Sequence, residues 1–227
     1  HRHFRRQRQM CIRDRDRDGL EIFAAIAHPA RNDVLIYRDG VNLKDISSIH
    51  IGTSSLRRKR QCKFFLGNEN CTEIRGNIDT RLNKLHQGEF DAIILAKAGI
   101  ERLGFNENYI DLDFLPAVGQ GVIAIQCRSD DQETKKILSK LKNEELDQCI
   151  EIERYVVRSL NATCSSALSI KANLLSNHFN VDLEIYGKEA FISKSISSEK
   201  IYQKDALDKF IDEVLSEGGL ELLNENY

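Results

Sequence analysis

IGTSSLRRKR, the stretch at residues 51–60, follows an apolar approach that begins at Ile46. Its glycine ends the approach, three hydroxyl residues able to cap a helix come next, and four cations follow. This order predicts a strand, a tight turn and a helix start. The N–H groups at a helix start are unpaired and carry partial positive charge, so they bind anions. Cations are unfavourable there, and a bound anion therefore explains Arg57 and Arg58 better than helix stability does.

The neighbouring sequence repeats the same strand, turn and helix order. After short strands at 20–27 and 33–38, we expect strands at 46–52, 71–75 and 90–96, each followed by a helix, at 54–66, at 78–87 and before the glycine at 104. Asn77 is the expected cap of the second helix. Units of this length indicate an α/β layer with parallel crossovers, in which ligands bind at the carboxyl ends of the strands.

The second half of the chain has a different pattern. A strand at 122–127 and helices at 130–141 and 144–160 precede an expected antiparallel meander at 168–173, 179–186 and 190–195, and a helix at 205–215. Gly119 and Gly121 lack the third glycine of a dinucleotide fingerprint, so we interpret them as a crossing between domains. We therefore divide the chain into a leader (1–18), an α/β domain (19–118), a returning segment (119–142) and a small α+β domain (143–227).

Charge is unevenly distributed along the 227 residues. The formal net charge is −2, but the first 18 residues hold seven Arg and three Asp, so the remainder is acidic and any basic site in it is a local pocket. The leader fits a disordered basic arm, a nucleic-acid or targeting tail, or sequence foreign to the protein, which we favour. The six Cys show no zinc spacing and no apolar run approaches a membrane span, so we expect reduced thiols, no metal, no membrane and a cytoplasmic location.

Five arginines follow the three strand ends: Arg57, Arg58, Arg75, Arg81 and Arg102. Neighbouring parallel strands lie about 5 Å apart, so these guanidinium groups would converge and repel unless several carboxylates or phosphates matched them. The alternative, a solvated helix surface, is the better interpretation for Lys59 and Arg60.

Cys164 is the other candidate for chemistry. It lies in a loop of small residues, NATCSS at 161–166, between a long helix and the first strand of the α+β domain. A thiol there can be accessible, although a lone cysteine is more often structural than reactive.

Four motifs carry a family resemblance. GTSSLRR, RGNIDTRL, FDAIILAKAGIERLG and LPAVGQGVIAIQCR, in this order, closely resemble hydroxymethylbilane synthase, also called porphobilinogen deaminase. The resemblance begins near Leu20. It implies a periplasmic-binding-protein-like α/β domain with a remnant of a further domain, and a small α+β domain. It also implies a monomeric transferase of porphyrin biosynthesis that condenses four porphobilinogen units with release of ammonia. The primer is a dipyrromethane cofactor, which the resemblance attaches covalently to Cys164.

The resemblance also gives roles to individual residues. It makes the five arginines ligands of the pyrrole carboxylates, with neutral donors from Thr53, Ser54, Ser55, Gly76 and Asn77, and it places Gln120 close to the cofactor. The family's catalytic aspartate has no counterpart here, so no catalytic residue is identified and we expect this chain alone not to complete turnover. The cofactor loop also departs from the family's Gly-Gly-Cys pattern.

Two other functions stay open from the residues alone. One is a two-domain module that binds a polycarboxylate without chemistry, and the other is nucleic-acid binding through LRRKR at 56–60, which we disfavour.

Overall fold

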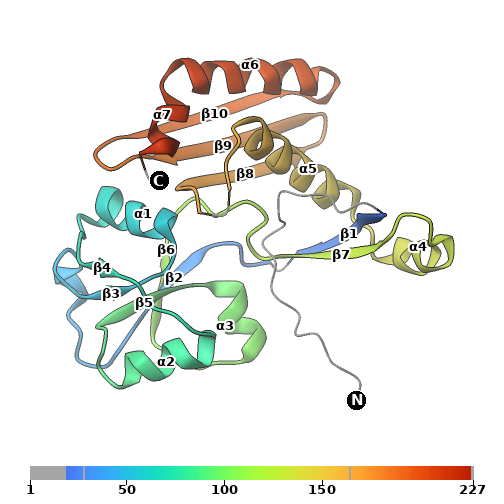
Figure 1. Ribbon diagram of the computed structural model, residues 1–227. Coiled ribbons are helices and arrows are strands. Elements are labelled where there is room, and N and C mark those ends of the chain that lie inside the picture. The colour runs from blue at the N-terminus through green and yellow to red at the C-terminus, as the bar shows by residue number, and fades with distance from the viewer. Residues whose placement is uncertain (1–18, 28, 164, 226–227) are drawn as a thin grey trace.

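The computed structural model describes residues 19–27, 29–163 and 165–225. Three sheets organise them: a five-stranded sheet in the order β4-β3-β5-β2-β6, a two-stranded ribbon of β1 and β7, and a three-stranded sheet in the order β10-β9-β8. Figure 1 shows helix α1 (Leu56–Leu66) between the five-stranded sheet and the three-stranded sheet, with the ribbon extending to one side. The fold is mixed α/β, as the sequence predicted.

The five-stranded sheet brings strand ends from distant parts of the chain to one edge. Its strands are β2 (Asp33–Tyr37), β3 (Ile51–Gly52), β4 (Cys71–Thr72), β5 (Ala92–Ala96) and β6 (Tyr109–Leu112). β3 runs parallel to β4 and β5, whereas β2 is antiparallel to β5, so Asp33 pairs with Ala96. The carboxyl ends of β3, β4 and β5 therefore share an edge with the first residue of β2.

Three helices pack on this sheet, and local signals fix their ends. They are α1 (Leu56–Leu66), α2 (Ile78–His86) and α3 (Lys97–Leu103). Ser55 and Asn77 cap α1 and α2, as predicted, because each side-chain oxygen accepts a hydrogen bond from a first-turn N–H. Gly67 ends α1 in the left-handed conformation. Buried aliphatic side chains such as Ile36, Ile93 and Leu85 hold α2 against the sheet.

Several strands are shorter than predicted. Of the expected strand 46–52, only Ile51 and Gly52 pair in the sheet, and a short helix η1 (Leu43–Asp45) and a turn precede them. The side-chain amide of Asn68 donates to the carbonyls of Ile46 and Ile49, so these backbone groups have a hydrogen-bond partner without a strand. The expected strand 71–75 likewise ends at Thr72, and β6 was not predicted.

The ribbon and the C-terminal unit complete the chain. β1 (Leu20–Ala27) pairs antiparallel with β7 (Val122–Arg128), and α4 (Gln132–Leu138) with η2 (Ser139–Leu141) follows. The C-terminal unit consists of α5 (Glu144–Ser159), β8 (Leu168–Leu175), β9 (His178–Tyr186), β10 (Phe191–Glu199), η3 (Lys200–Tyr202), α6 (Gln203–Ser216) and α7 (Gly219–Asn224). Its sheet is the antiparallel meander that the sequence predicted.

Helix α1 is packed against both larger sheets. On the C-terminal side, the rings of Phe64 and Phe65 contact those of Tyr186 and Phe191 of β9 and β10, with Phe65 meeting both edge-on. The side-chain amide of Gln61 donates to the Ser169 hydroxyl of β8 at 3.2 Å. Within the described residues, no helix is long and apolar enough to span a membrane.

Candidate functional site at the edge of the five-stranded sheet

Arg57 lies in the first turn of α1 with its guanidinium buried inside the protein. One terminal nitrogen donates to Gln61 Oε1 at 2.7 Å and to the Leu115 carbonyl at 2.9 Å. The other donates to Asp33 Oδ2 at 2.8 Å and to Gln120 Oε1 at 3.1 Å. These bonds use four of the five N–H donors of an arginine, and only 4% of the side chain is exposed. Arg57 therefore joins α1 to β2 and to the segment after β6.

Arg58 shares the same carboxylate but keeps donors free. Its Nε and Nη2 donate to Asp33 Oδ1 at 3.1 and 2.7 Å, and its Nη1 donates to the Ile94 carbonyl at 3.3 Å. Two N–H donors remain at the outer end of the guanidinium, and 13% of the side chain is exposed. Arg58 can thus bind a further carboxylate at that end.

Asp33 is the acceptor that both arginines share. Burial raises the pKa of its carboxyl, but the charges of Arg58 and Arg57 and their hydrogen bonds outweigh burial, so the pKa lies below its ordinary value. The carboxylate is therefore ionised and serves as a fixed counter-ion.

Gln120 closes this cluster from the segment that precedes β7. Its amide nitrogen donates to Asp33 Oδ1 at 3.0 Å and to the Arg31 carbonyl at 2.8 Å, while its oxygen accepts from Arg57. Arg31 forms an ion pair with the buried Glu153 at 2.8 Å. The segment between β1 and β2 is thus held in place by the side-chain amide of Gln120 and by the ion pair between Arg31 and Glu153.

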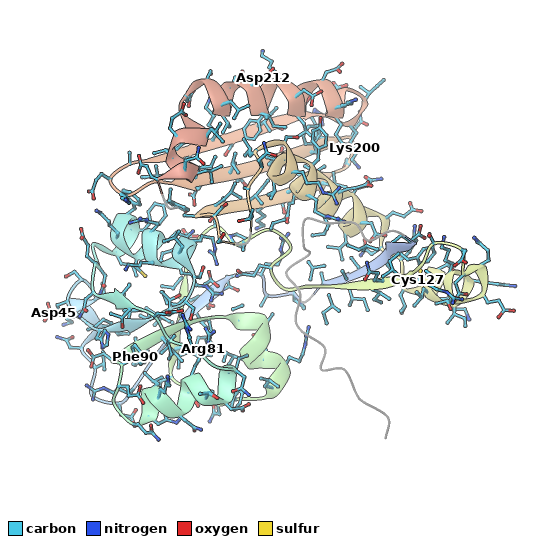
Figure 2. All side chains as sticks on the ribbon, viewed as in Figure 1. Asp45, Arg81, Phe90, Cys127, Lys200 and Asp212 are labelled. Atoms are coloured by element: carbon cyan, nitrogen blue, oxygen red, sulfur yellow. The ribbon has the colours of Figure 1, made fainter. Side chains whose placement is uncertain are left out.

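Arg81 lies on α2, near the middle of the five-stranded sheet unit in Figure 2. Its Nε donates to the Gly76 carbonyl at 2.9 Å, and no carboxylate in the described part of the chain pairs with it. Burial and the positive charge of Arg58 lower its pKa. Arg58 and Arg81 are therefore two cations close enough to repel one another. Among the described residues, Arg58 is paired with the carboxylate of Asp33, whereas Arg81 is paired with none.

The turn between β4 and α2 positions Arg81. Asn77 accepts hydrogen bonds from the backbone and hydroxyl of Thr80 at 2.9 and 2.7 Å. Gly76 has a φ of +118°, which favours glycine. Arg75, in the same turn, pairs with Glu73 at 2.8 Å and is 82% exposed, so it lies at the open rim of the site.

The three hydroxyl residues support the turn into α1. Thr53 is buried and its hydroxyl accepts from the backbone of Ser55 at 3.2 Å. Ser54 is exposed and donates to the Ile74 carbonyl, while Ser55 caps the helix. The structure thus brings together the loops after β3 and β4.

Two predicted residues do not join this group. Arg102 is exposed in the last turn of α3, at the far end of that helix from the sheet edge, and has no hydrogen bond or ion pair to any described residue. Cys164 lies outside the described residues.

Sequence reasoning missed Asp33 and Gln61. Asp33 precedes an apolar strand, and a carboxylate at the start of a buried strand is a usable signal because it needs a partner. Gln61 lies four residues after Arg57, where side chains on a helix meet.

Comparison with known proteins gives a family match over much of the chain. Residues 12–136 match the family model described as "Porphobilinogen deaminase, dipyromethane cofactor binding domain". The chain is 36% identical over 218 residues to a porphobilinogen deaminase of Syntrophobacter fumaroxidans, covering 92% of this chain and 70% of the relative. It is 35% identical over 222 residues to that of Staphylococcus carnosus, covering 92% and 71%.

The chain belongs to the porphobilinogen deaminase family. The family function is hydroxymethylbilane synthase, a transferase of tetrapyrrole biosynthesis that uses porphobilinogen, and the chain carries the domain that binds the dipyrromethane cofactor. Among solved structures, an amino acid transporter substrate-binding protein of Streptococcus pneumoniae aligns over 55% of this chain and 56% of its own, with 15% identity and a TM-score of 0.31.

Proposed function

We propose that the sheet edge binds the carboxylates of the dipyrromethane cofactor and of porphobilinogen during hydroxymethylbilane synthesis, with Arg58 and Arg81 as the central ligands. The observation that carries this proposal is the pair itself. Arg58 retains two N–H donors and Arg81 has no carboxylate partner among the described residues. An anion between them would offset their mutual repulsion.

The charge of the site supports a polycarboxylate ligand. Four predicted arginines lie at this edge, whereas Asp33 and Glu73 are the only carboxylates of the described residues that form ion pairs with them. This group of cations lies in a chain with a formal net charge of −2. Rim arginines such as Arg75 would attract and hold outer carboxylates, although exposed pairs contribute little each.

The donor set fits the cofactor. When bound, a dipyrromethane presents acetate and propionate carboxylates together with a nucleophilic pyrrole carbon. The outer end of Arg58 and the guanidinium of Arg81 would hold those carboxylates through charge-assisted hydrogen bonds. Ser54 is exposed in the turn before α1, but its hydroxyl already donates to the Ile74 carbonyl.

The described residues that follow Cys164 in sequence contact the arginine cluster. The loop that contains Cys164 leads into β8, and Ser169 at the start of β8 binds Gln61, which in turn binds Arg57. We therefore infer that the thioether of the cofactor forms at Cys164, five residues before Ser169 in sequence.

Intact-mass measurement tests the function. The chain incubated with hydroxymethylbilane should gain the mass of this tetrapyrrole less one water, because the thiol displaces its hydroxyl group, and Cys164→Ser should not. Arg58→Lys and Arg81→Lys should load more slowly, whereas Lys59→Met, an exposed change on the same helix, should load normally. Equal loading by Arg58→Lys, Arg81→Lys and the unmodified chain would contradict the assignment of the two arginines.

Four coarser expectations from the sequence remain proposals. We propose a periplasmic-binding-protein-like α/β domain at 19–118, a returning segment at 119–142 and an α+β domain at 143–227. The three separate sheets support this division.

We also propose a monomer, which sedimentation velocity would test, and a cytoplasmic location, which fractionation of cells would test. We keep Arg102 as a lower-ranked ligand because of its position at the far end of α3.

A further inference from the structure

The arginine pair at the start of α1 is asymmetric, although its members are adjacent in sequence. Arg57 uses four N–H donors within the protein, and Arg58 uses three. Both depend on Asp33, whose side chain is 0% exposed. No role in ligand binding was expected for this aspartate from the sequence.

We propose, on the basis of the function above, that Asp33 is a positioning residue: it fixes Arg57 inside the protein and orients Arg58, so that Arg58 and Arg81, but not Arg57, contact the pyrrole carboxylates.

The geometry of the two guanidinium groups supports this division. Asp33 Oδ1 accepts hydrogen bonds from both Nε and Nη2 of Arg58. These two bonds hold the edge of the guanidinium that carries Nε and Nη2, and so fix its orientation. The free hydrogens then lie at the outer end, where a second carboxylate can bind. Asp33 Oδ2 accepts from Arg57, and the carbonyl of Leu115 and the amides of Gln61 and Gln120 take its other terminal hydrogens.

The position of Asp33 makes this orientation rigid. It is the first residue of β2, paired in register with Ala96 of β5 and Leu112 of β6. A carboxylate on a buried strand moves less than one on a loop, and rigid elements hold binding groups most accurately. Gln120 adds a third donor to Oδ1, which leaves this oxygen committed to the protein.

A double-mutant cycle separates positioning from simple stability. In the full chain carrying Cys164→Ser, which excludes covalent loading, porphobilinogen affinity is measured by calorimetry for Asp33→Asn, Arg58→Lys and the pair. Asp33→Asn should weaken binding about tenfold, the order expected for a misaligned charge-assisted hydrogen bond. In the Arg58→Lys background, Asp33→Asn should have no further effect, because both changes act on one contact.

An aspartate that only stabilised the fold would lower the melting temperature and leave the affinity of the folded protein unchanged, or its effect would add to that of Arg58→Lys. Either result would overturn the proposal. Asp33→Glu, which keeps the charge, should recover part of the affinity. If Asp33→Asn does not fold, nitrogen-15 NMR of the Cys164→Ser chain decides the matter. Porphobilinogen should shift the Nε signals of Arg58 and Arg81 and leave that of Arg57 in place, and a shifted Arg57 signal would refute it.

The result that would refute the role of Asp33 differs from the result that would refute the proposed function. No detectable binding of porphobilinogen by the chain with intact Asp33 would refute both. Binding that depends on Arg58 and Arg81 but is unaffected by Asp33→Asn would retain the function and refute the role of Asp33.

Discussion

Arg57 and Arg58 show how one step along a helix changes the role of the same residue type. Adjacent helical residues point about 100° apart, so Arg57 lies against β2 and the segment after β6 while Arg58 lies at the sheet edge. A buried ion pair contributes little net stability, but removal of one partner leaves an uncompensated charge. The structure thus predicts opposite consequences for the two residues.

Arg57→Met should strongly destabilise the fold. It leaves Asp33 buried with Arg58 as its only cation and frees three neutral acceptors, so we expect a loss of about 3 kcal/mol in the free energy of unfolding. Urea unfolding followed by circular dichroism measures this loss. Lys59→Met is the control, because Lys59 is exposed and lies two residues after Arg57 on the same helix. It should leave the midpoint unchanged. A midpoint for Arg57→Met equal to that of the control would show that the buried bonds do not form in solution.

Asp33 should give the fold an acid-sensitive component. Its folded pKa lies below the ordinary value because the charges of Arg58 and Arg57 outweigh burial. Its contribution to stability is therefore fully present above the unfolded pKa of about 3.9 and is lost as pH falls through the folded pKa. Unfolding free energies measured between about pH 5 and about pH 2 should fall more steeply for the unmodified chain than for Asp33→Asn. Parallel curves would contradict the ionised, paired state of Asp33.

The sequence predicted that these arginines form an anion site but could not divide them by role. Asp33 lies 24 residues before Arg57, and its pairing depends on β2 lying next to β5 in the sheet. The residues next to LRRKR in the sequence do not indicate which arginine is buried. The register of a sheet, rather than any motif, makes that assignment.

At the scale of elements, the turn between β4 and α2 carries a testable constraint. A Cβ on Gly76 would lie 2.7 Å from Cβ of Thr80, whereas a Cβ on Gly88, at the other end of α2, would meet nothing within 4 Å. Both glycines have positive φ. Gly88→Ala should therefore cost about 1 kcal/mol from backbone strain alone, and Gly76→Ala should cost more.

The two glycine variants should also differ in binding. The Gly76 carbonyl accepts from Arg81 Nε, so a shifted turn moves Arg81. In calorimetry with the Cys164→Ser chain, Gly76→Ala should weaken porphobilinogen binding and Gly88→Ala should not. Equal affinities would show that Gly76 does not position Arg81.

Helix ends were predictable where strand ends were not. Ser55, Asn77 and Gly67 cap their helices through contacts within a few residues, so sequence alone identifies them. The residues from Ile46 to Ile49 have strand composition, yet Asn68 binds their carbonyls, and this contact spans about twenty positions of sequence. β6 was missed because its pairing with β2 crosses a still longer interval.

At the scale of the whole molecule, α1 connects the two larger sheets. Arg57 binds Asp33 of β2, and further along the same helix Gln61, Phe64 and Phe65 contact β8 and β9. One helix therefore contacts both the sheet edge and the C-terminal unit. Glu184 of β9 is an ionisable group at that junction, next to Tyr186 and Gln61.

Glu184→Gln should stabilise the protein at neutral pH. Burial raises the pKa of Glu184, and hydrogen bonds from Tyr186 and Gln61 and the charge of Arg57 only partly oppose it, while Asp182 adds to the increase. A raised carboxyl pKa means that the folded state binds the proton more tightly. The favourable contribution is thus present below the unfolded pKa of about 4.3 and is lost as pH rises through the folded pKa.

The glutamine variant removes this dependence and keeps an acceptor for Tyr186. We expect a gain of up to about 1 kcal/mol at pH near 7.5, after allowance for solvent screening of a half-buried group, and no gain near pH 4. Thermal melts at the two pH values measure it. Glu189→Gln is the matched control, since Glu189 has a lowered pKa through its pair with Lys63 on the same face, and it should give no gain at either pH. A destabilised Glu184→Gln at neutral pH would mean that the charge of Glu184, paired with Arg57 across the junction, holds the two units together.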